Sequence, residues 1–325
     1  MKHEIGSFLE LDLRKNNEYF SGETDIARLN SARAGIYHAC RLLGCSSILI
    51  PYYLCPSVYS FLTVHEINVE YYFINEDFEP REVVQKPAQA FLLVNYFGIL
   101  SYDRMISLAA RFKNVIIDNS AGFFFKPLNN LYSIYSPRKF FGVPDGGYVL
   151  GPEAERMTSE YDQDRSSDTS LFLLKRIEYG LTATYHERMI NEERINKSGV
   201  LRMSILTNAI LNNIDYVSIR QRRSENYLLA HEQLKSINLI DPLSICDDAS
   251  VPMVYPLVLK DDLMTEKLKE NNIYVGRLWK HVLGQVNESS FEALLSRYLV
   301  PVPIDQRYCS EEIISICKCI SNLKN

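Results

Sequence analysis

The sequence predicts an α/β fold: a mainly parallel sheet flanked by helices forms a large domain, and a smaller α/β domain follows it. Short, continuous apolar runs such as Ser47–Pro51 and Val115–Ile117 alternate with amphipathic segments of helical spacing. Strands that are buried on both faces of a parallel sheet have this character. From about residue 236 a second, shorter set of strands and helices begins. We therefore expect a large domain over residues 1–235 and a small C-terminal domain over residues 236–325.

The expected elements follow from apolar spacing and from the residues that end each segment. The clearest helix is Ala32–Leu43, which Asn30 or Ser31 caps and Gly44 closes. Residues 153–235 are expected to be mostly helical. Further strands are expected at Ser47–Pro51, Val69–Ile74, Ala90–Asn95, Val115–Ile117, Tyr148–Leu150, Met253–Leu259, Tyr274–Leu278 and, as an extended segment, Leu299–Ile304. Further helices are expected at Val58–His65, Tyr102–Phe112, Asp261–Asn271 and Glu311–Leu323.

Composition excludes several classes of protein. The 325 residues are 46% hydrophobic and 23% charged with a net charge of −5, which does not fit nucleic acid or an anionic membrane as the main partner. Seven irregularly spaced cysteines indicate reduced thiols rather than a metal site. No apolar run is long enough to span a bilayer, and Met1–Ile5 does not begin a signal peptide. We therefore expect a cytoplasmic protein.

One lysine and one aspartate stand out for their surroundings. Asp118 follows the apolar run Val115–Ile117, and Lys139 lies three residues after Ser136 and shortly before the turn Asp145–Gly147. Pyridoxal phosphate requires a lysine for a Schiff base and a carboxylate that holds a proton on the pyridine nitrogen. The sequence therefore predicts a pyridoxal-phosphate site with Lys139 and Asp118 as catalytic residues. The alternatives are a solvated lysine and an aspartate that caps a following helix.

Other residues are candidates for holding the cofactor. The backbone of Ser31, Ala32 and Arg33 opens a helix, and helix starts bind anions such as a phosphate. The hydroxyl of Ser136 could bind the same phosphate.

Two strand ends and a later arginine complete the set of candidates. Tyr53 could stack on the pyridine ring in preference to Tyr52, and Asn95 could point into the site. Core packing of both tyrosines and a turn-capping role for Asn95 are the alternatives. Arg202 could bind a substrate anion or a phosphate across a subunit boundary, or it could face solvent.

These residues together resemble a known family, the DegT/DnrJ/StrS-type sugar aminotransferases, which are pyridoxal-phosphate enzymes of fold type I. The similarity runs in order over nearly the whole chain. The matching segments are Asn30–Ile36, Ile48–Val58, Val94–Gly98, Ile116–Asp118, Lys139 with Asp145–Gly147, Gly199–Ser204 and Leu299–Ile304. The lysine segment is similar to a divergent branch that is met among surface-polysaccharide genes.

The resemblance implies a fold-type-I aminotransferase that moves an amino group, usually from glutamate, onto a nucleotide-linked keto-sugar. It implies a homodimer with sites at the subunit interface. In this interpretation Lys139 binds the cofactor covalently and then serves as the general base, while Asp118 keeps the ring nitrogen protonated.

Three positions depart from the family pattern. Ala121 stands where a Gln or His usually contacts the cofactor's phenolic oxygen, so a donor such as Asn95 or Asn119, or a water, is expected in its place. Val200 replaces an asparagine that reaches the neighbouring site, and Ile134 replaces the phosphate serine, so Ser136 or Ser133 must substitute. Two alternatives therefore stay open: a decayed, non-catalytic scaffold, and a sugar dehydratase. The dehydratases that resemble this family have histidine in place of the lysine.

Overall fold

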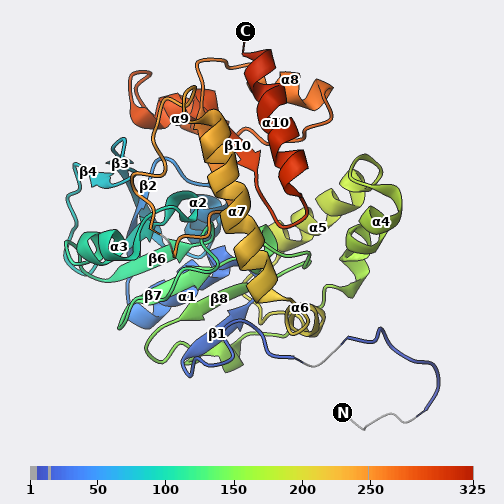
Figure 1. The fold of residues 1–325 in the computed structure, drawn as a ribbon. Helices are drawn as coiled ribbons and strands as arrows, with labels where there is room; N and C mark the ends of the chain where they lie inside the picture. The colour runs from blue at the N-terminus through green and yellow to red at the C-terminus, as the bar shows by residue number, and fades with distance from the viewer. Residues whose placement is uncertain (1–5, 14–15, 248, 325) are drawn as a thin grey trace.

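The computed structural model describes residues 6–13, 16–247 and 249–324. Its centre is an eight-stranded sheet with the order β1-β8-β7-β6-β5-β2-β3-β4, flanked by helices (Figure 1). The pairs β2–β3, β2–β5, β5–β6 and β6–β7 are parallel, whereas β8 is antiparallel to β7 and β1, and β4 to β3. The predicted mainly parallel sheet is confirmed. The strands are β1 Ile26–Leu29, β2 Ser47–Pro51, β3 Asn68–Ile74, β4 Pro80–Arg81, β5 Ala90–Val94, β6 Val115–Asn119, β7 Tyr132–Tyr135 and β8 Gly147–Leu150.

The C-terminal part of the chain adds a second, two-stranded antiparallel sheet, β9 (Val254–Val258) and β10 (Leu299–Pro303). The long helix α7 runs from the main sheet towards these elements and contacts α10 there (Figure 1). The helices are α1 Ala32–Leu43, α2 Pro56–Val64, α3 Tyr102–Ala109, α4 Leu171–Tyr179, α5 Tyr185–Lys197, α6 Ile205–Leu211, α7 Tyr216–Leu234, α8 Met264–Glu270, α9 Phe291–Tyr298 and α10 Ser310–Leu323. The division into two domains at residue 235 stays a prediction.

Helix α1 forms as its sequence predicts. Ser31 caps it, because its side-chain oxygen accepts a hydrogen bond from the backbone N of Ala34 at 3.3 Å, and Gly44 ends it with a φ of 67°. Gly35 allows close packing on the sheet, since a Cβ there would lie 3.0 Å from the Val149 side chain. The start of α1 is therefore fixed against the sheet.

Several predictions about individual elements were wrong. Residues Tyr274–Leu278 do not form a strand, because β9 and β10 pair only with each other. Residues 153–170 form turns and short 3₁₀ helices instead of longer helices. The sequence interpretation also missed β1, β7 and α9, whose short segments gain stability from their neighbours in the fold.

The strand directions identify the edge of the sheet at which a ligand is expected to bind. Strands β1, β2, β5, β6 and β7 point the same way, and the antiparallel β8 begins where they end. Ligands of open α/β sheets bind outside the carboxyl ends of the strands. The residues that follow these strands are therefore the candidates for an active site.

No helix within the described ranges is both long and apolar enough to cross a membrane. Residues 1–5, on which the expectation of a cytoplasmic location partly depends, lie outside the described residues.

Candidate active site

Asp118 is a buried carboxylate at the carboxyl end of β6. Its side chain is 5% exposed, and its Oδ1 accepts a hydrogen bond from the backbone N of Ser120 at 2.8 Å. Asp118 pairs with Ile134 in the register of β6 and β7, so both side chains lie on the sheet face that α1 covers. Turns follow Asp118, and no helix begins there, so the helix-capping alternative is wrong. The carboxylate is held by its own turn at the edge where α1 begins.

A second turn packs beside Asp118 and fixes two asparagines. Asn95 is fully buried: its Nδ2 donates to Asn119 Oδ1 at 3.1 Å, and its Oδ1 accepts from the backbone N of Leu100 at 3.2 Å. Both ends of the Asn95 amide thus serve the protein itself, as the turn-capping alternative proposes. The Nδ2 of Asn119 is buried and finds no acceptor among the described residues.

Asn95, which holds the Asn119 amide, lies beside Gly122, the residue after Ala121, because a Cβ on Gly122 would lie 3.0 Å from Asn95 Nδ2. Gly98, with a φ of 74°, packs against this segment so closely that a Cβ would lie 2.4 Å from the Ala121 carbonyl oxygen. The turns that follow β5 and β6 thus pack closely against each other. The Nδ2 of Asn119 is a hydrogen-bond donor of this region without an acceptor among the described residues.

The start of α1 forms a cradle with the glycine turn before β8. The backbone N of Gly146 donates to the carbonyl of Asn30 at 2.8 Å, and a Cβ on Gly147 would lie 2.4 Å from the Ser31 carbonyl carbon. Only glycine allows this approach. Ser31 forms a parallel bridge with Gly146, which engages the backbone N–H of Ala32, whereas the backbone N–H of Arg33 donates to no acceptor in the described part of the chain. This helix start can therefore bind an anion.

The turn is anchored from its other side by Asp145. This fully buried carboxylate accepts hydrogen bonds from the backbone N of Ser204 at 2.8 Å, from Ser204 Oγ at 2.6 Å and from the hydroxyl of Thr207. Asp145 thereby joins the glycine turn to the first turn of α6 and has a structural role.

Lys139 ends the 3₁₀ helix η2 (Pro137–Lys139), which follows β7. Its side chain is exposed and forms no salt bridge with the described residues. Its backbone N contacts the Ser136 carbonyl at 3.4 Å, and Ser136 itself is 7% exposed. The fold thus presents a free amine on a loop that is fixed at both ends.

The residue after the lysine is clamped by a buried arginine that the sequence interpretation missed. Arg223 of α7 is 2% exposed and its guanidinium lies 4.5 Å from the centre of the Phe140 ring. It donates to Gln306 Oε1 at 2.9 Å and to the Met253 carbonyl at 3.1 Å, while Gln306 Nε2 donates to the Phe140 carbonyl at 2.8 Å. Burial lowers the pKa of Arg223 to about 10. In the sequence Arg223 only looks like one member of a charged helical run, so no signal marked it.

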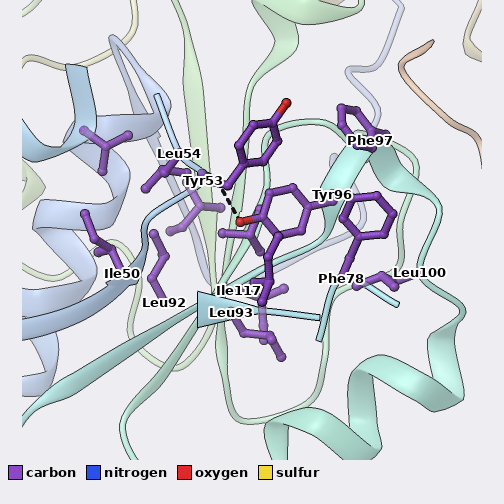
Figure 2. Packing of buried hydrophobic residues seen from close by; sticks show 14 of the residues in the cluster. Ile50, Tyr53, Leu54, Phe78, Leu92, Leu93, Tyr96, Phe97, Leu100 and Ile117 are labelled. Atoms are coloured by element: carbon purple, nitrogen blue, oxygen red, sulfur yellow. Dashed lines mark hydrogen bonds between the residues drawn. The ribbon is translucent and has the colours of Figure 1, made fainter. Parts of the chain in front are cut away.

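Tyr53 packs in the core rather than at an open site (Figure 2). Its ring is fully buried, 4.5 Å from that of Trp279 between ring centres, and the Tyr96 hydroxyl donates to the Tyr53 carbonyl at 2.7 Å. Burial raises the pKa of Tyr53. Tyr52 stacks on Tyr71 at 4.8 Å. The core-packing alternative describes both tyrosines in the single chain.

Arg202 lies apart from the other candidates. Its backbone bridges to Leu29 on the outer side of β1, and its Nε donates to the Tyr161 carbonyl at 3.1 Å. A groove along this side of the sheet is lined by Arg202, Arg28 and Gln163 among others. Within one chain the structure therefore does not bring Arg202 to Asp118 and Lys139.

Comparison with known proteins gives a clear result for the fold. No family model and no curated protein matches the sequence. Solved structures do match. CalS13, a sugar aminotransferase from Micromonospora echinospora, has a TM-score of 0.66 at 15% identity, over 93% of this chain and 88% of its own. The sugar aminotransferase Spr1654 of Streptococcus pneumoniae has a TM-score of 0.64 at 13% identity, over 94% and 89%.

A third similar structure is DesV of S. venezuelae, with a TM-score of 0.63 at 16% identity, over 93% of this chain and 86% of its own. A DegT DnrJ EryC1 StrS aminotransferase from Brucella abortus also matches, with a TM-score of 0.61 at 13% identity. The resemblance seen in the sequence is thus confirmed in three dimensions: the chain has the fold of the DegT/DnrJ/EryC1/StrS-type sugar aminotransferases.

Proposed function

We propose that the protein is a pyridoxal-phosphate-dependent aminotransferase that transfers an amino group to a keto-sugar. One observation carries the proposal: Asp118, the loop of Lys139 and the free helix start at Ser31 converge at one edge of a sheet with the fold of sugar aminotransferases. That edge offers a proton-holding carboxylate, a free amine and an anion cradle. Spr1654 has been solved in forms named for pyridoxal and pyridoxamine phosphate, which supports the same cofactor class here.

The residues present fit this cofactor. A ring nitrogen needs a carboxylate, which Asp118 provides, and the phosphate needs an unpaired N–H group at a helix start, which Arg33 provides. The Nδ2 of Asn119 is buried and unpaired, but Asn119 follows Asp118 in β6 and its side chain points to the opposite face of the sheet, beside Tyr135, so its contact with a phenolic oxygen stays a prediction. Ser136 at the start of η2 is a further hydroxyl for the phosphate. When bound, pyridoxal phosphate supplies an aldehyde that bonds amines and a ring that accepts electrons from the substrate.

The chain's own residues then have distinct tasks. Asp118 would hold a proton on the pyridine nitrogen, and its burial would keep water from screening that charge pair. Lys139 Nζ would hold the cofactor, and as a free amine it would serve as the group that takes up and returns a proton. Arg223 and Gln306 keep this amine in place through Phe140.

Finer parts of the proposal follow from the resemblance. Glutamate is the proposed donor, a nucleotide-linked keto-sugar the proposed acceptor, and surface-polysaccharide synthesis in the cytoplasm the proposed setting. A homodimer is also proposed, and Arg202 would act in substrate binding at the site of the neighbouring subunit, since it lies away from the site of its own chain.

The direct test uses the purified protein. We expect a visible absorption band that borohydride bleaches and fixes to Lys139, and that L-glutamate converts to a near-ultraviolet band. Lys139→Ala should abolish the reducible band, and retention of that band would refute the assignment. If the protein binds the cofactor but does not transfer the amino group of a donor, the alternative of a decayed, non-catalytic scaffold holds. If the protein eliminates water from the sugar without transferring an amino group, the dehydratase alternative holds.

A further inference from the structure

Residues 271–281, which we call the strap, are weakly held in the C-terminal part of the chain. None of them is buried, and residues 273–279 form no regular secondary structure. No backbone N–H group of residues 274–279 donates to a backbone carbonyl of the described residues. Segments with few buried side chains and free backbone groups open at a low cost in free energy. The strap can therefore move while the rest of the fold stays intact.

An aromatic contact fastens the strap to the main sheet. The ring of Trp279 lies 4.5 Å from the ring of Tyr53 between centres, in an edge-to-face arrangement. Tyr53 is fully buried, whereas Trp279 is only half-buried, so Trp279 packs over Tyr53 from the solvent side. Edge-to-face pairs contribute a modest stabilisation beyond the area that they bury. Trp279 thus holds the strap closed against Tyr53.

Two features of this closed arrangement oppose the contact. Trp279 has a φ of 55° and a ψ of 50°, which is the left-handed region and is strained for a bulky aromatic residue. The Tyr53 hydroxyl is buried, points away from Tyr96 (Figure 2) and has no hydrogen-bond partner among the described residues. Such a hydroxyl costs free energy that hydration would return. The closed and open arrangements of the strap therefore differ little in free energy.

Tyr53 is connected to the turn that carries Asp118. The Tyr96 hydroxyl donates to the Tyr53 carbonyl at 2.7 Å, and the backbone N of Asn95 donates to the Asp118 carbonyl at 3.0 Å. In the sheet, β5 alone separates β2, which precedes Tyr53, from β6, which contains Asp118. Two strand spacings amount to about 10 Å. The contact of the strap therefore lies at the same edge of the sheet as the proposed site.

We propose that the strap is a lid over this edge of the sheet and that Trp279 is its latch. When the lid is closed it keeps water away from the buried Asp118, and when it is open it admits ligands while the Tyr53 hydroxyl becomes hydrated. The inference rests on the proposed function for what the lid admits, of which pyridoxal phosphate is the first to enter. The motion itself follows from the strap and its latch alone.

The first test follows the latch without any ligand. Trp279 is the sole tryptophan of the chain, so protein labelled with 5-fluorotryptophan gives one fluorine resonance that reports it. We expect relaxation dispersion of this resonance, because lids move in microseconds to milliseconds. Tyr53→Phe removes the unpartnered hydroxyl, so it should lower the open population about tenfold and flatten the dispersion.

The matched control is Tyr179→Phe, which changes an exposed tyrosine of α4 and should leave the dispersion as in the wild type. A flat dispersion profile in the wild type overturns the inference.

The second test measures the gate. In Trp279→Gly the latch ring is lost, and glycine adopts the left-handed backbone without strain. A gate slows entry and exit alike, so the association and dissociation rates of pyridoxal phosphate in stopped-flow absorbance should both rise about fivefold or more, with little change in affinity. If Trp279 only packs against the core, the variant loses thermal stability and keeps the wild-type association rate. That result overturns the inference, as does a rise in the dissociation rate alone.

The outcomes separate the lid from the proposed function. If the wild type binds no pyridoxal phosphate but shows dispersion that Tyr53→Phe flattens, the lid stands and the proposed function fails. If pyridoxal phosphate binds and its rates are equal in the wild type and in Trp279→Gly, the lid fails and the proposed function stands.

Discussion

Asp118→Asn is the substitution that isolates the charge of the proposed site. In the structure Oδ1 accepts one hydrogen bond, from the backbone N of Ser120 at 2.8 Å, and an asparagine oxygen can accept the same bond. We therefore expect the free energy of unfolding to change by no more than about 1 kcal/mol. The side chain is 5% exposed, so water cannot replace the lost charge. Only the ability to hold the proton on the pyridine nitrogen is removed.

The expected effect on rate is large. Loss of a preorganised electrostatic group costs about 3–5 kcal/mol of transition-state stabilisation, which slows the reaction roughly 10²- to 5 × 10³-fold. The assay is the half-reaction with L-glutamate at saturating cofactor, followed by stopped-flow absorbance. Asp103→Asn, an exposed aspartate in the first turn of α3, is the matched control and should react at the normal rate. A half-reaction within tenfold of the wild type in Asp118→Asn would show that Asp118 only shapes the turn.

Four further substitutions test the site and its support. Ala121→Gln should leave pyridoxal-phosphate affinity equal or improved in a fluorescence titration, since it adds a donor at a half-buried position; a tenfold loss would contradict this. Gly147→Ala should lower the free energy of unfolding by at least about 2 kcal/mol, because its Cβ would lie 2.4 Å from the Ser31 backbone; chemical denaturation measures it. Arg223→Met should cost about 2 kcal/mol by the same measurement, because it leaves buried acceptors without donors, and an unchanged value would refute the clamp. Burial lowers the pKa of His38 from its usual 6.5, so near and below that pH the unfolded chain binds a proton that the folded chain does not bind. The free energy of unfolding should therefore fall as the pH drops below about 6.5. Thermal melts over this pH range measure the effect, and His38→Gln should make the stability less dependent on pH.

The long periodic segments of the fold could be predicted from the sequence, and the short ones could not. Helix Ala32–Leu43 has a cap, an apolar face and a closing glycine, so local signals alone define it. Strand β7 (Tyr132–Tyr135) has only four residues, two of them tyrosines, and exists because β6 and β8 pair with it. Tyr274–Leu278 shows the reverse case: its pattern is strand-like, and no neighbour pairs with it.

The same distinction holds for the site. Asp118 could be predicted to lie at a ligand-binding edge because the carboxyl ends of parallel strands define that edge. The contact of Arg138 with Glu192 could not, since it joins a loop to a helix more than fifty residues later, and only the packing of α5 brings them together. Tyr53 illustrates a further limit: position after a strand does not tell whether a ring faces the ligand or the core.

Val200 stands where the family has an asparagine, so this position cannot contribute a polar side chain to a second subunit. The segment around Val200 is nevertheless held firmly within its own chain. Val200 is half-buried and packs against the core, so it cannot extend a polar group outwards as an asparagine would. Its segment is nevertheless firmly placed: Asn30 donates to the Gly199 carbonyl at 3.0 Å through Nδ2, and its backbone N donates to the Leu201 carbonyl at 2.9 Å. Asn30 directly precedes the helix start, so this segment and the anion cradle are one unit. In a homodimer, the exposed Arg202 rather than position 200 is then the polar side chain that this segment can contribute to the neighbouring site.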